Sequence, residues 1–252
     1  MKALANYVHS KGLLFGIYTD VGTETCGGQP GAYGHECADA ALYAEWGVDF
    51  LKEDHCGLPP HNDTDRFYAE SLTKMSKCLN ATGRHIFFDL CAHGCYDTGQ
   101  LHNMTCWKQW YMLAETIGNS WRTTTDVAVR GPRMWPSVLN NWYRNDAFQT
   151  KLNLSQFAGP GHWNDPDSLV VGLPGLSLTQ QRTQFTMWAM MNAPLIAGNR
   201  LDTMTEEVAS ILLNRDVIAL NQDSKALQGR RVQVRLRLPC HKPTSLVGCG
   251  LF

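Results

Sequence analysis

Short apolar segments alternate with longer amphipathic segments along most of the chain, and this alternation predicts the fold. The apolar segments are rich in β-branched and aromatic residues, as buried strands are. Six segments fit this description and are predicted strands: 13–18, 48–51, 85–91, 119–126, 161–167 and 194–198. Strands that alternate with helices indicate a parallel sheet with helical crossovers.

Seven segments predict helices, because of their helix propensity or because their apolar side chains recur three and four residues apart. They are 1–11, 37–46, 64–79, 107–117, 135–150, 179–192 and 205–213. In the third of these, Phe67, Leu72, Met75 and Leu79 are expected to face inward. We predict 205–213 to be the last helix.

The pattern changes at Gln228. Residues 230–238 alternate like a strand with one charged face, and a Pro- and Gly-containing end follows. We therefore divide the chain into 1–227 and 228–252. The second part is expected to be either the first strand of an all-β domain or a tail that packs on nothing.

The composition is that of a globular protein, with 252 residues, 44% of them hydrophobic and 18% charged. This length suits one large domain or two small ones. The net charge of −1 gives no reason to expect nucleic acid as a partner. All apolar runs are far shorter than the roughly 20 residues of a membrane span, so no membrane partner is expected. Whether the chain forms a homodimer is left open.

Nine cysteines are many for a cytosolic chain of this length, and none forms a CxxC zinc pattern. Four Asn-x-Ser/Thr sequons, predicted glycosylation sites, occur at Asn62, Asn80, Asn103 and Asn153. Together they favour the secretory pathway, either extracellular or lysosomal/vacuolar. The first ten residues nevertheless lack the apolar core of a signal peptide. A fragment of a longer protein would explain this lack and the odd number of cysteines.

Chemically capable side chains stand at the carboxyl ends of the predicted strands. They are Tyr18, Asp20, Lys52, Asp54, Cys91, Arg122, Asp126, Asp165 and Asp167. In a βα barrel these ends meet at one mouth, so residues far apart in sequence converge there. Two positioned carboxylates with cations nearby are what glycoside cleavage requires.

Two of these carboxylates fit the two roles of that reaction. Lys52 lies two residues before Asp54, hence on the same side of an extended strand, and is expected to keep Asp54 ionised. Asp54 is therefore the better candidate for the nucleophile and Asp126 for the acid. A divalent-metal site is the alternative use of the carboxylates. Lys52 and Arg122 would repel the ion, so we expect neither metal nor cofactor.

Four motifs occur in order along the chain. They are Gly16-Ile-Tyr18, Lys52-Glu-Asp54-His-Cys56, Asn119-Ser-Trp-Arg122 with Asp126, and Ala158-Gly-Pro-Gly-His-Trp-Asn-Asp-Pro-Asp167. This set resembles glycoside hydrolase family 27, which contains α-galactosidases (melibiases) and α-N-acetylgalactosaminidases. The resemblance implies a (β/α)8 barrel followed by an antiparallel β domain. It also implies removal of terminal α-linked galactose from oligosaccharides, glycolipids and glycoproteins, with retention and without metal.

The resemblance assigns roles to the matching positions. Asp54 falls on the nucleophile and Asp126 on the acid/base. The implied substrate-binding residues are Tyr18, Cys26, Lys52, Arg122 and Asp167. Cys26 and Cys56 fall on a disulfide beside the nucleophile.

The chain departs from the family pattern in three places. Ala92 and His93 stand where α-galactosidases usually carry Glu-Trp, which leaves an α-N-acetylgalactosaminidase as the alternative. Cys91 lacks its usual partner, so Cys95 or Cys106 is expected to replace it. The first two βα units of the family and most of its β domain are missing. The fold expected is thus an incomplete (β/α)8 barrel with about six units, and a truncated, non-catalytic sugar-binding relative is the second alternative.

Four other expectations concern single residues near the motifs. Asp165 is expected to cap its loop, and Trp163 to lie in the core. The roles open to His55 and His93 are those of ligand or base, but single histidines at such a mouth are more often hydrogen-bonded bystanders, which is what we expect. Cys37 and Cys78 are expected to be buried thiols or to pair with partners that the sequence does not identify.

Overall fold

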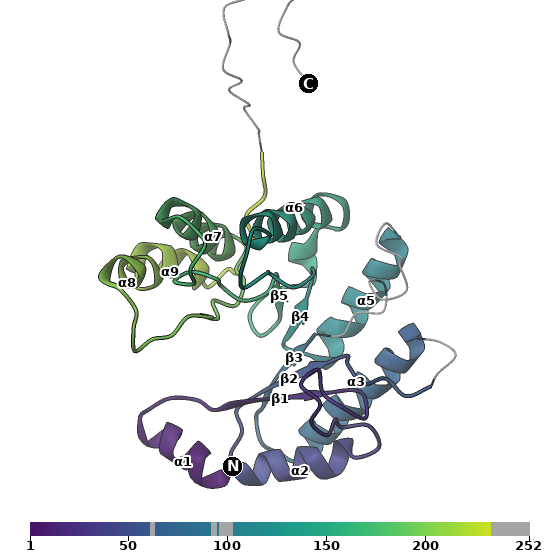
Figure 1. Ribbon diagram of the computed structural model, residues 1–252. Coiled ribbons are helices and arrows are strands. Elements are labelled where there is room, and N and C mark those ends of the chain that lie inside the picture. The colour runs from purple at the N-terminus through teal and green to yellow at the C-terminus, as the bar shows by residue number, and fades with distance from the viewer. Residues whose placement is uncertain (61–63, 92–94, 96–102, 233–252) are drawn as a thin grey trace, which may run out of the picture.

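The computed structural model describes residues 1–60, 64–91, 95 and 103–232 (Figure 1). The strands are β1 (Gly16–Asp20), β2 (Phe50–Asp54), β3 (Phe87–Leu90), β4 (Ser120–Arg122) and β5 (Trp163–Asp165). The helices are α1 (Lys2–Ser10), α2 (Glu36–Trp46), α3 (Thr64–Ala81), α5 (Met104–Ile117), α6 (Met134–Leu152), α7 (Leu178–Met190), α8 (Glu206–Leu212) and α9 (Arg215–Asn221). A short 3-10 helix covers Leu154–Gln156. None of the helices within the described residues is long and apolar enough to cross a membrane.

The strands form one parallel sheet in the order β1-β2-β3-β4-β5. Each strand pairs with the next along the chain, so the order never reverses as it does in a doubly wound sheet. This one-way progression is that of a βα barrel. Figure 1 shows α1, α2 and α3 beside one end of the curved sheet and α6 to α9 beside the other. The predicted parallel sheet with helical crossovers is confirmed, as an open, five-stranded arrangement within the described residues.

Two elements near the carboxyl end of the chain differ from expectation. Residues 194–198 form no sixth strand; the segment contributes one isolated parallel bridge, between Leu169 and Ala197. Pro194 at its start has no N–H to donate to a ladder. Helix α9 follows the segment predicted to be the last helix, and Asn214 marks its beginning by accepting a hydrogen bond from the Val217 N–H.

The alternation along β2 separates the outer face of the sheet from the inner face. Leu51 and Glu53 are fully buried, whereas Lys52 and Asp54 are partly exposed. Successive side chains of a strand point to opposite faces. Lys52 and Asp54 therefore share the inner face, and the apolar Leu51 joins the helix-packed core.

Two hydrophobic clusters hold the helices on the sheet. The first includes Leu51, Leu72, Trp107 and Trp121 and packs β2 and β4 against α3 and α5. In α3 the fully buried aromatic residue is Tyr68, whereas Phe67 is only partly buried. The second cluster joins α6, α7 and α8. Its buried side chains include Val138, Phe185, Trp188, Val208 and Ile211.

The cysteines of the described residues form three disulfides; one decides between alternatives that the sequence left open, and one corrects an expectation. Cys37 pairs with Cys78, which ties α2 to α3. Cys95 pairs with Cys106, so neither serves as the partner of Cys91. Cys91 is a buried free thiol. The expected replacement failed because the two candidates bond each other across eleven residues.

Three of the sequons lie within the described residues, and Asn80, Asn103 and Asn153 are all exposed. Asn62 lies outside the described residues, as do Ala92, His93 and the segment 233–252. Residues 230–232, the described part of the predicted carboxyl-terminal strand, form no strand.

Candidate active site

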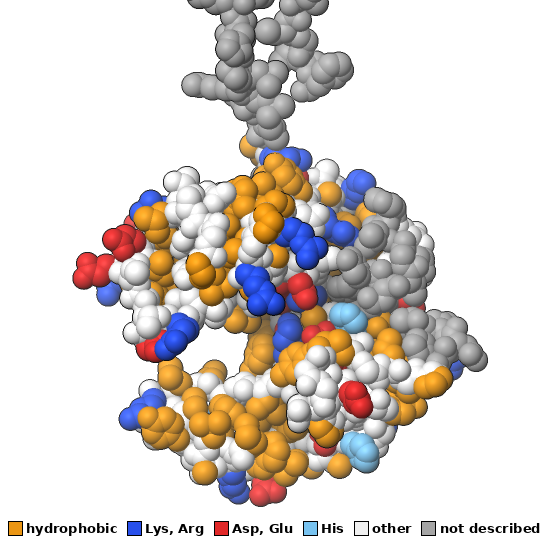
Figure 2. Space-filling model, in the orientation of Figure 1, with side chains coloured by type: hydrophobic (Ala, Val, Ile, Leu, Met, Phe, Trp, Pro, Cys, Tyr) orange, Lys and Arg blue, Asp and Glu red, His pale blue; other side chains and the backbone are white. Residues whose placement is uncertain are grey.

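The register of the sheet aligns residues in two rows on its inner face, and the sequence-predicted Tyr18, Lys52, Asp54 and Arg122 are among them. The first row is Tyr18, Lys52, Asp89, Ser120 and Trp163. The second row is Asp20, Asp54, Arg122 and Asp165, with Cys91 following β3 between Asp54 and Arg122. The predicted convergence of strand ends is thus what the parallel pairing produces. Figure 2 shows acidic and basic side chains gathered in the middle of one face of the molecule.

Asp54 accepts hydrogen bonds on both of its carboxylate oxygens. The Tyr18 hydroxyl donates to Oδ2 at 2.7 Å, and the His55 backbone N–H donates to Oδ1 at 2.9 Å. The His55 ring nitrogen Nδ1 lies 2.8 Å from the same Oδ1. Burial opposes ionisation of Asp54, but the contacts with His55 and Tyr18 outweigh it and hold its pKa well below the ordinary range. His55 is therefore a direct partner of Asp54 and not a bystander.

Tyr18 and the disulfide brace one side of this carboxylate. Cys26 and Cys56 are disulfide-bonded, which is the pairing implied by the family resemblance. The Tyr18 hydroxyl lies 3.2 Å from the Cys26 sulfur. Burial and the adjacent Asp54 raise the pKa of Tyr18, so its hydroxyl stays a hydrogen-bond donor.

The loops after β1 and β2 pack against each other by backbone contact. A Cβ on Gly22 would overlap the Cys56 carbonyl, and one on Gly57 would overlap the backbone of Glu24. The Asp20 carboxylate accepts from the Cys56 N–H at 2.6 Å. Glycine is required at these two positions because the backbones approach too closely for a side chain.

Lys52 does not pair with Asp54, which corrects the expected electrostatic partner. Its Nζ lies 2.9 Å from Asp89 and 4.0 Å from Asp165. Asp89 is its register partner on β3, and the long side chain reaches across to the neighbouring strand instead of along its own. Burial disfavours the charged ammonium, but Asp89, Cys91 and Asp165 outweigh it and raise the pKa of Lys52.

Arg122 is a buried cation that joins the two loops following β4 and β5. Its Nη2 lies 3.1 Å from Asp126 and 3.3 Å from Asp167, and its Nη1 lies 3.5 Å from the Cys91 sulfur. The Asp126 side chain is 90% exposed. Asp126 thus stands at the solvent side of Arg122, free to meet a ligand that enters from solution.

Asp165 and Asp167 shape the loop after β5. Asp165 accepts from the Asp167 N–H at 2.8 Å, as a loop cap does. Burial and the charge of Asp89 raise the pKa of Asp165 to about 6. Asp167 has a positive φ of 84° and accepts from the Val127 N–H at 2.6 Å, so it also fastens the loop that carries Asp126.

Asp89 is the site residue that sequence reasoning missed. It accepts from Ser120 as well as pairing with Lys52, and it is 1% exposed. The signal was present, because Asp89 lies two residues before Cys91 and so shares its face of the predicted strand.

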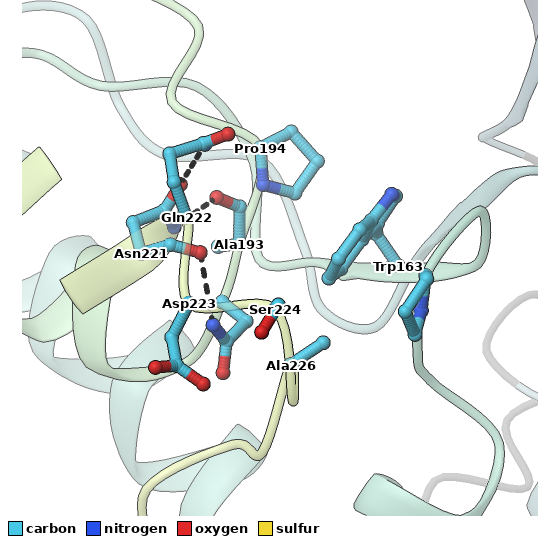
Figure 3. A pocket seen from close by; sticks show the side chains of 10 residues that line it. Trp163, Ala193, Pro194, Asn221, Gln222, Asp223, Ser224 and Ala226 are labelled. Carbon is cyan, nitrogen blue, oxygen red and sulfur yellow. Dashed lines mark hydrogen bonds between the residues drawn. The ribbon is translucent and has the colours of Figure 1, made fainter. Parts of the chain in front are cut away.

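Trp163 lines a pocket and is only partly buried, which corrects its expected place in the core. The pocket has a volume of about 270 Å³. Figure 3 shows Trp163 on one side and the segments around Pro194 and Gln222 on the other. Trp163 faces this space because its strand neighbour Asn164 turns the opposite way, with its side chain accepting from the Trp121 indole N–H.

Comparison with known proteins places this arrangement in a family. The family model described as α-galactosidase A (melibiase) matches residues 1–223. An α-galactosidase of Oryza sativa is 42% identical over 92% of this chain and 50% of its own. An α-N-acetylgalactosaminidase of Gallus gallus is 40% identical over 92% of this chain and 53% of its own. The crystal structure of α-galactosidase I from Mortierella vinacea superposes with a TM-score of 0.78 at 33% identity, covering 93% of this chain and 58% of that one.

These matches cover nearly the whole chain, yet the chain spans about half the length of the curated relatives it matches. The family model covers all four motifs and the strands that carry them. The chain belongs to glycoside hydrolase family 27, the family of the α-galactosidases and α-N-acetylgalactosaminidases.

Proposed function

We propose that this chain carries the catalytic carboxylates of a retaining hydrolase that removes terminal α-linked galactose. The observation that carries the proposal is the environment of Asp54. The two carboxylate oxygens of Asp54, at the carboxyl end of β2, are held by Tyr18 and His55, and a second, exposed carboxylate, Asp126, is fastened by Arg122. Family membership supports the galactoside substrate, because the relatives from Oryza sativa and Dictyostelium discoideum, 42% and 41% identical, are named α-galactosidase and probable α-galactosidase.

The two carboxylates divide the reaction between them. Asp54 attacks the anomeric carbon while Asp126 gives its proton to the leaving oxygen, so a glycosyl ester forms on Asp54 as the glycosidic bond breaks. Asp126, now ionised, takes a proton from water, whose oxygen attacks the same carbon and releases Asp54. Two inversions give overall retention. We expect the two carboxyl groups to lie ~5–5.5 Å apart when substrate is bound.

The other assigned residues support this chemistry without forming bonds. Tyr18 and the Cys26–Cys56 disulfide hold Asp54 in place, and Arg122 holds Asp126. Lys52 and Asp167 are proposed to contact the sugar, Lys52 through N–H groups and Asp167 through carboxylate lone pairs that their ion pairs do not use. The three disulfides support a secretory compartment, in which such bonds persist. We also propose that residues 1–227 form the barrel part of the chain and that residues 228–252 are the start of a β domain or a tail.

A mechanism-based label tests the nucleophile. A galactose-configured epoxide inactivator is opened by a retaining nucleophile and leaves an ester on it, with the acid/base protonating the epoxide oxygen. Intact mass should show one adduct per chain, and peptide mapping should place it on Asp54. Asp54→Asn should remove the adduct, whereas Asp216→Asn, an exposed carboxylate in α9, should keep it. A label on another residue, or one that survives Asp54→Asn, would remove Asp54 from the mechanism.

A chimaera tests the activity itself. Residues 1–223 replace the matching part of the rice enzyme, so that the rest of the barrel is supplied. Hydrolysis of an aryl α-galactoside, with retention observed by proton NMR, is the expected result. A chimaera that folds but hydrolyses only the aryl α-N-acetylgalactosaminide would overturn the choice of sugar. A folded chimaera that is inert to both would favour a non-catalytic relative.

A further inference from the structure

The Asp54 carboxylate is surrounded by nitrogen and sulfur atoms as well as by oxygen. Atoms of Asp54, His55 and Cys91 lie within 4.8 Å of one another. Cys91 is a free thiol and contributes a hydrogen bond to Asp54. His55 brings Nδ1 to 2.8 Å from Oδ1. Ligand atoms of three different types, oxygen, nitrogen and sulfur, thus lie close together at one place.

We propose that Asp54, His55 and Cys91 form a binding site for a borderline-soft divalent metal ion of the zinc class, and that the bound ion blocks the nucleophile. The binding stands on the geometry alone, and only the inhibition rests on the proposed function. Thiolate, imidazole and carboxylate are the ligands that Zn²⁺ and Co²⁺ accept in tetrahedral sites, with a fourth position left for water. Mg²⁺ and Ca²⁺ demand more oxygen ligands than this set supplies.

The contacts that now join the three residues are hydrogen bonds that a metal ion can replace. The ion takes the lone pair of His55 Nδ1, whose proton moves to Nε2, and an oxygen of Asp54. The S–H bond of Cys91 breaks, its proton leaves to solvent, and a metal–sulfur bond forms. The three ligand atoms already lie within 4.8 Å of one another, so they start close to the separations that one ion would require.

The two nearby cations do not forbid the ion, because each already faces two carboxylates. Lys52 lies between Asp89 and Asp165. Arg122 lies between Asp126 and Asp167. Neither cation needs Asp54 for its neutralisation, so the charge of Asp54 is available to a divalent ion. The Nη1 group of Arg122, 3.5 Å from the Cys91 sulfur, is placed to donate to a metal-bound thiolate.

A second cluster nearby serves as an internal comparison. Asp20, Cys26 and Cys56 also bring ligand atoms within 4.8 Å of one another. Both of those sulfurs are in a disulfide and cannot supply a thiolate. The free thiol of Cys91 is therefore what makes the Asp54 cluster a metal site.

Co²⁺ is the probe that reports the sulfur ligand directly. Titration of the chain with Co²⁺, without thiol reductant, should produce a thiolate-to-metal charge-transfer band, and Zn²⁺ should displace it. Cys91→Ser should abolish the band. His55→Asn should weaken Zn²⁺ binding by at least about tenfold, since even the loss of an outer-shell partner costs that much. His35→Asn, at an exposed histidine before α2, and the double variant Cys240→Ser/Cys249→Ser should leave both readouts unchanged.

Circular dichroism confirms that each variant is folded before it is scored. A charge-transfer band that persists in Cys91→Ser, or that disappears in the Cys240/Cys249 variant, overturns the proposal. Equal Zn²⁺ affinity in wild type and His55→Asn also overturns it. In the chimaera, Zn²⁺ should inhibit wild type at least about tenfold more strongly than Cys91→Ser. If the chimaera proves inert, the Co²⁺ experiment still decides the metal site, so the two proposals fail separately.

Discussion

The Lys52 ammonium group lies 2.9 Å from an oxygen of Asp89 on the neighbouring strand, and this pair crosses the inner face of the sheet beneath the candidate nucleophile. Asp89→Asn should lower the free energy of unfolding by roughly 1.5–3 kcal/mol, because hydrogen bonds to charged groups are worth this much and Lys52 would keep only the more distant Asp165. Urea denaturation measures the loss. Glu45→Gln, which breaks the exposed Lys2–Glu45 pair, should cost about 0–1 kcal/mol. Equal losses in the two variants would contradict the structural role of Asp89.

Glu53 is a fully buried carboxyl group whose two oxygens have no hydrogen-bond partner within the described residues. Burial, together with the charges of Glu36, Asp20 and Asp39, raises its pKa well above the ordinary value. A carboxyl group with a raised pKa in the folded state contributes most at acidic pH, and its contribution is lost as the pH rises through that pKa. The wild-type chain therefore loses stability from this group on the way to neutral pH.

Glu53→Leu should accordingly raise the free energy of unfolding at pH 7 by about 1–3 kcal/mol, the cost of an unsatisfied buried polar group. The gain should shrink when urea denaturation is repeated at pH 4. Glu24→Leu, at an exposed carboxylate, supplies the control and should give no such pH-dependent gain. A gain at pH 4 as large as that at pH 7 would show that folding does not raise the pKa of Glu53.

Tyr18→Phe removes the donor to Oδ2 of Asp54 while keeping the ring. We expect the second-order rate of epoxide labelling at Asp54 to fall by about tenfold or more, since a hydrogen bond to a charged group is lost. Intact mass over time measures the rate. Tyr33→Phe, at an exposed tyrosine of the same loop region, should label like wild type. Unchanged labelling in Tyr18→Phe would show that the contact does not position Asp54.

Removing the Cys26–Cys56 or the Cys37–Cys78 disulfide should affect stability similarly but site geometry differently. These disulfides close loops of 30 and 41 residues, so replacing either pair by serines should cost about 3–4 kcal/mol on the chain-entropy model. Only the Cys26/Cys56 variant should also slow epoxide labelling, because only that pair contacts Tyr18. Thermal unfolding and labelling at a temperature where both variants are folded test this, and equal labelling rates would refute it.

The sequence predicts most of the fold because hydrophobic periodicity is local. Five of the six predicted strands are present: the third, fourth and fifth are shorter than predicted, and the first two end further along the chain than predicted. The predicted 119–126 strand ends at Arg122, where the chain turns so that Arg122 and Asp126 can pair. Disulfide pairings that depend on how helices pack cannot be predicted from the sequence pattern. Cys37 and Cys78 meet because α2 and α3 lie side by side, and no spacing rule announces that contact.

The candidate site shows the same division. Tyr18, Asp54 and Arg122 were found because strand ends of a parallel sheet must converge. The expected partner of Lys52 is wrong because a long side chain reaches its register neighbour on the next strand, Asp89, and that register cannot be derived from spacing along one strand. His55 was undervalued because the direction of a side chain after a strand end depends on the turn that follows.

The packing of Gly22 on Cys56 and of Gly57 on Glu24 has a mechanical consequence. The Cys26–Cys56 disulfide also joins the loops after β1 and β2, so these loops cannot separate. They form one rigid unit next to Tyr18 and Asp54. This side of the mouth cannot open to admit a bulky substrate or close over a small one. Any movement that selects among leaving groups must therefore occur on the opposite side of the mouth. Substitutions that alter leaving-group preference should map to that side.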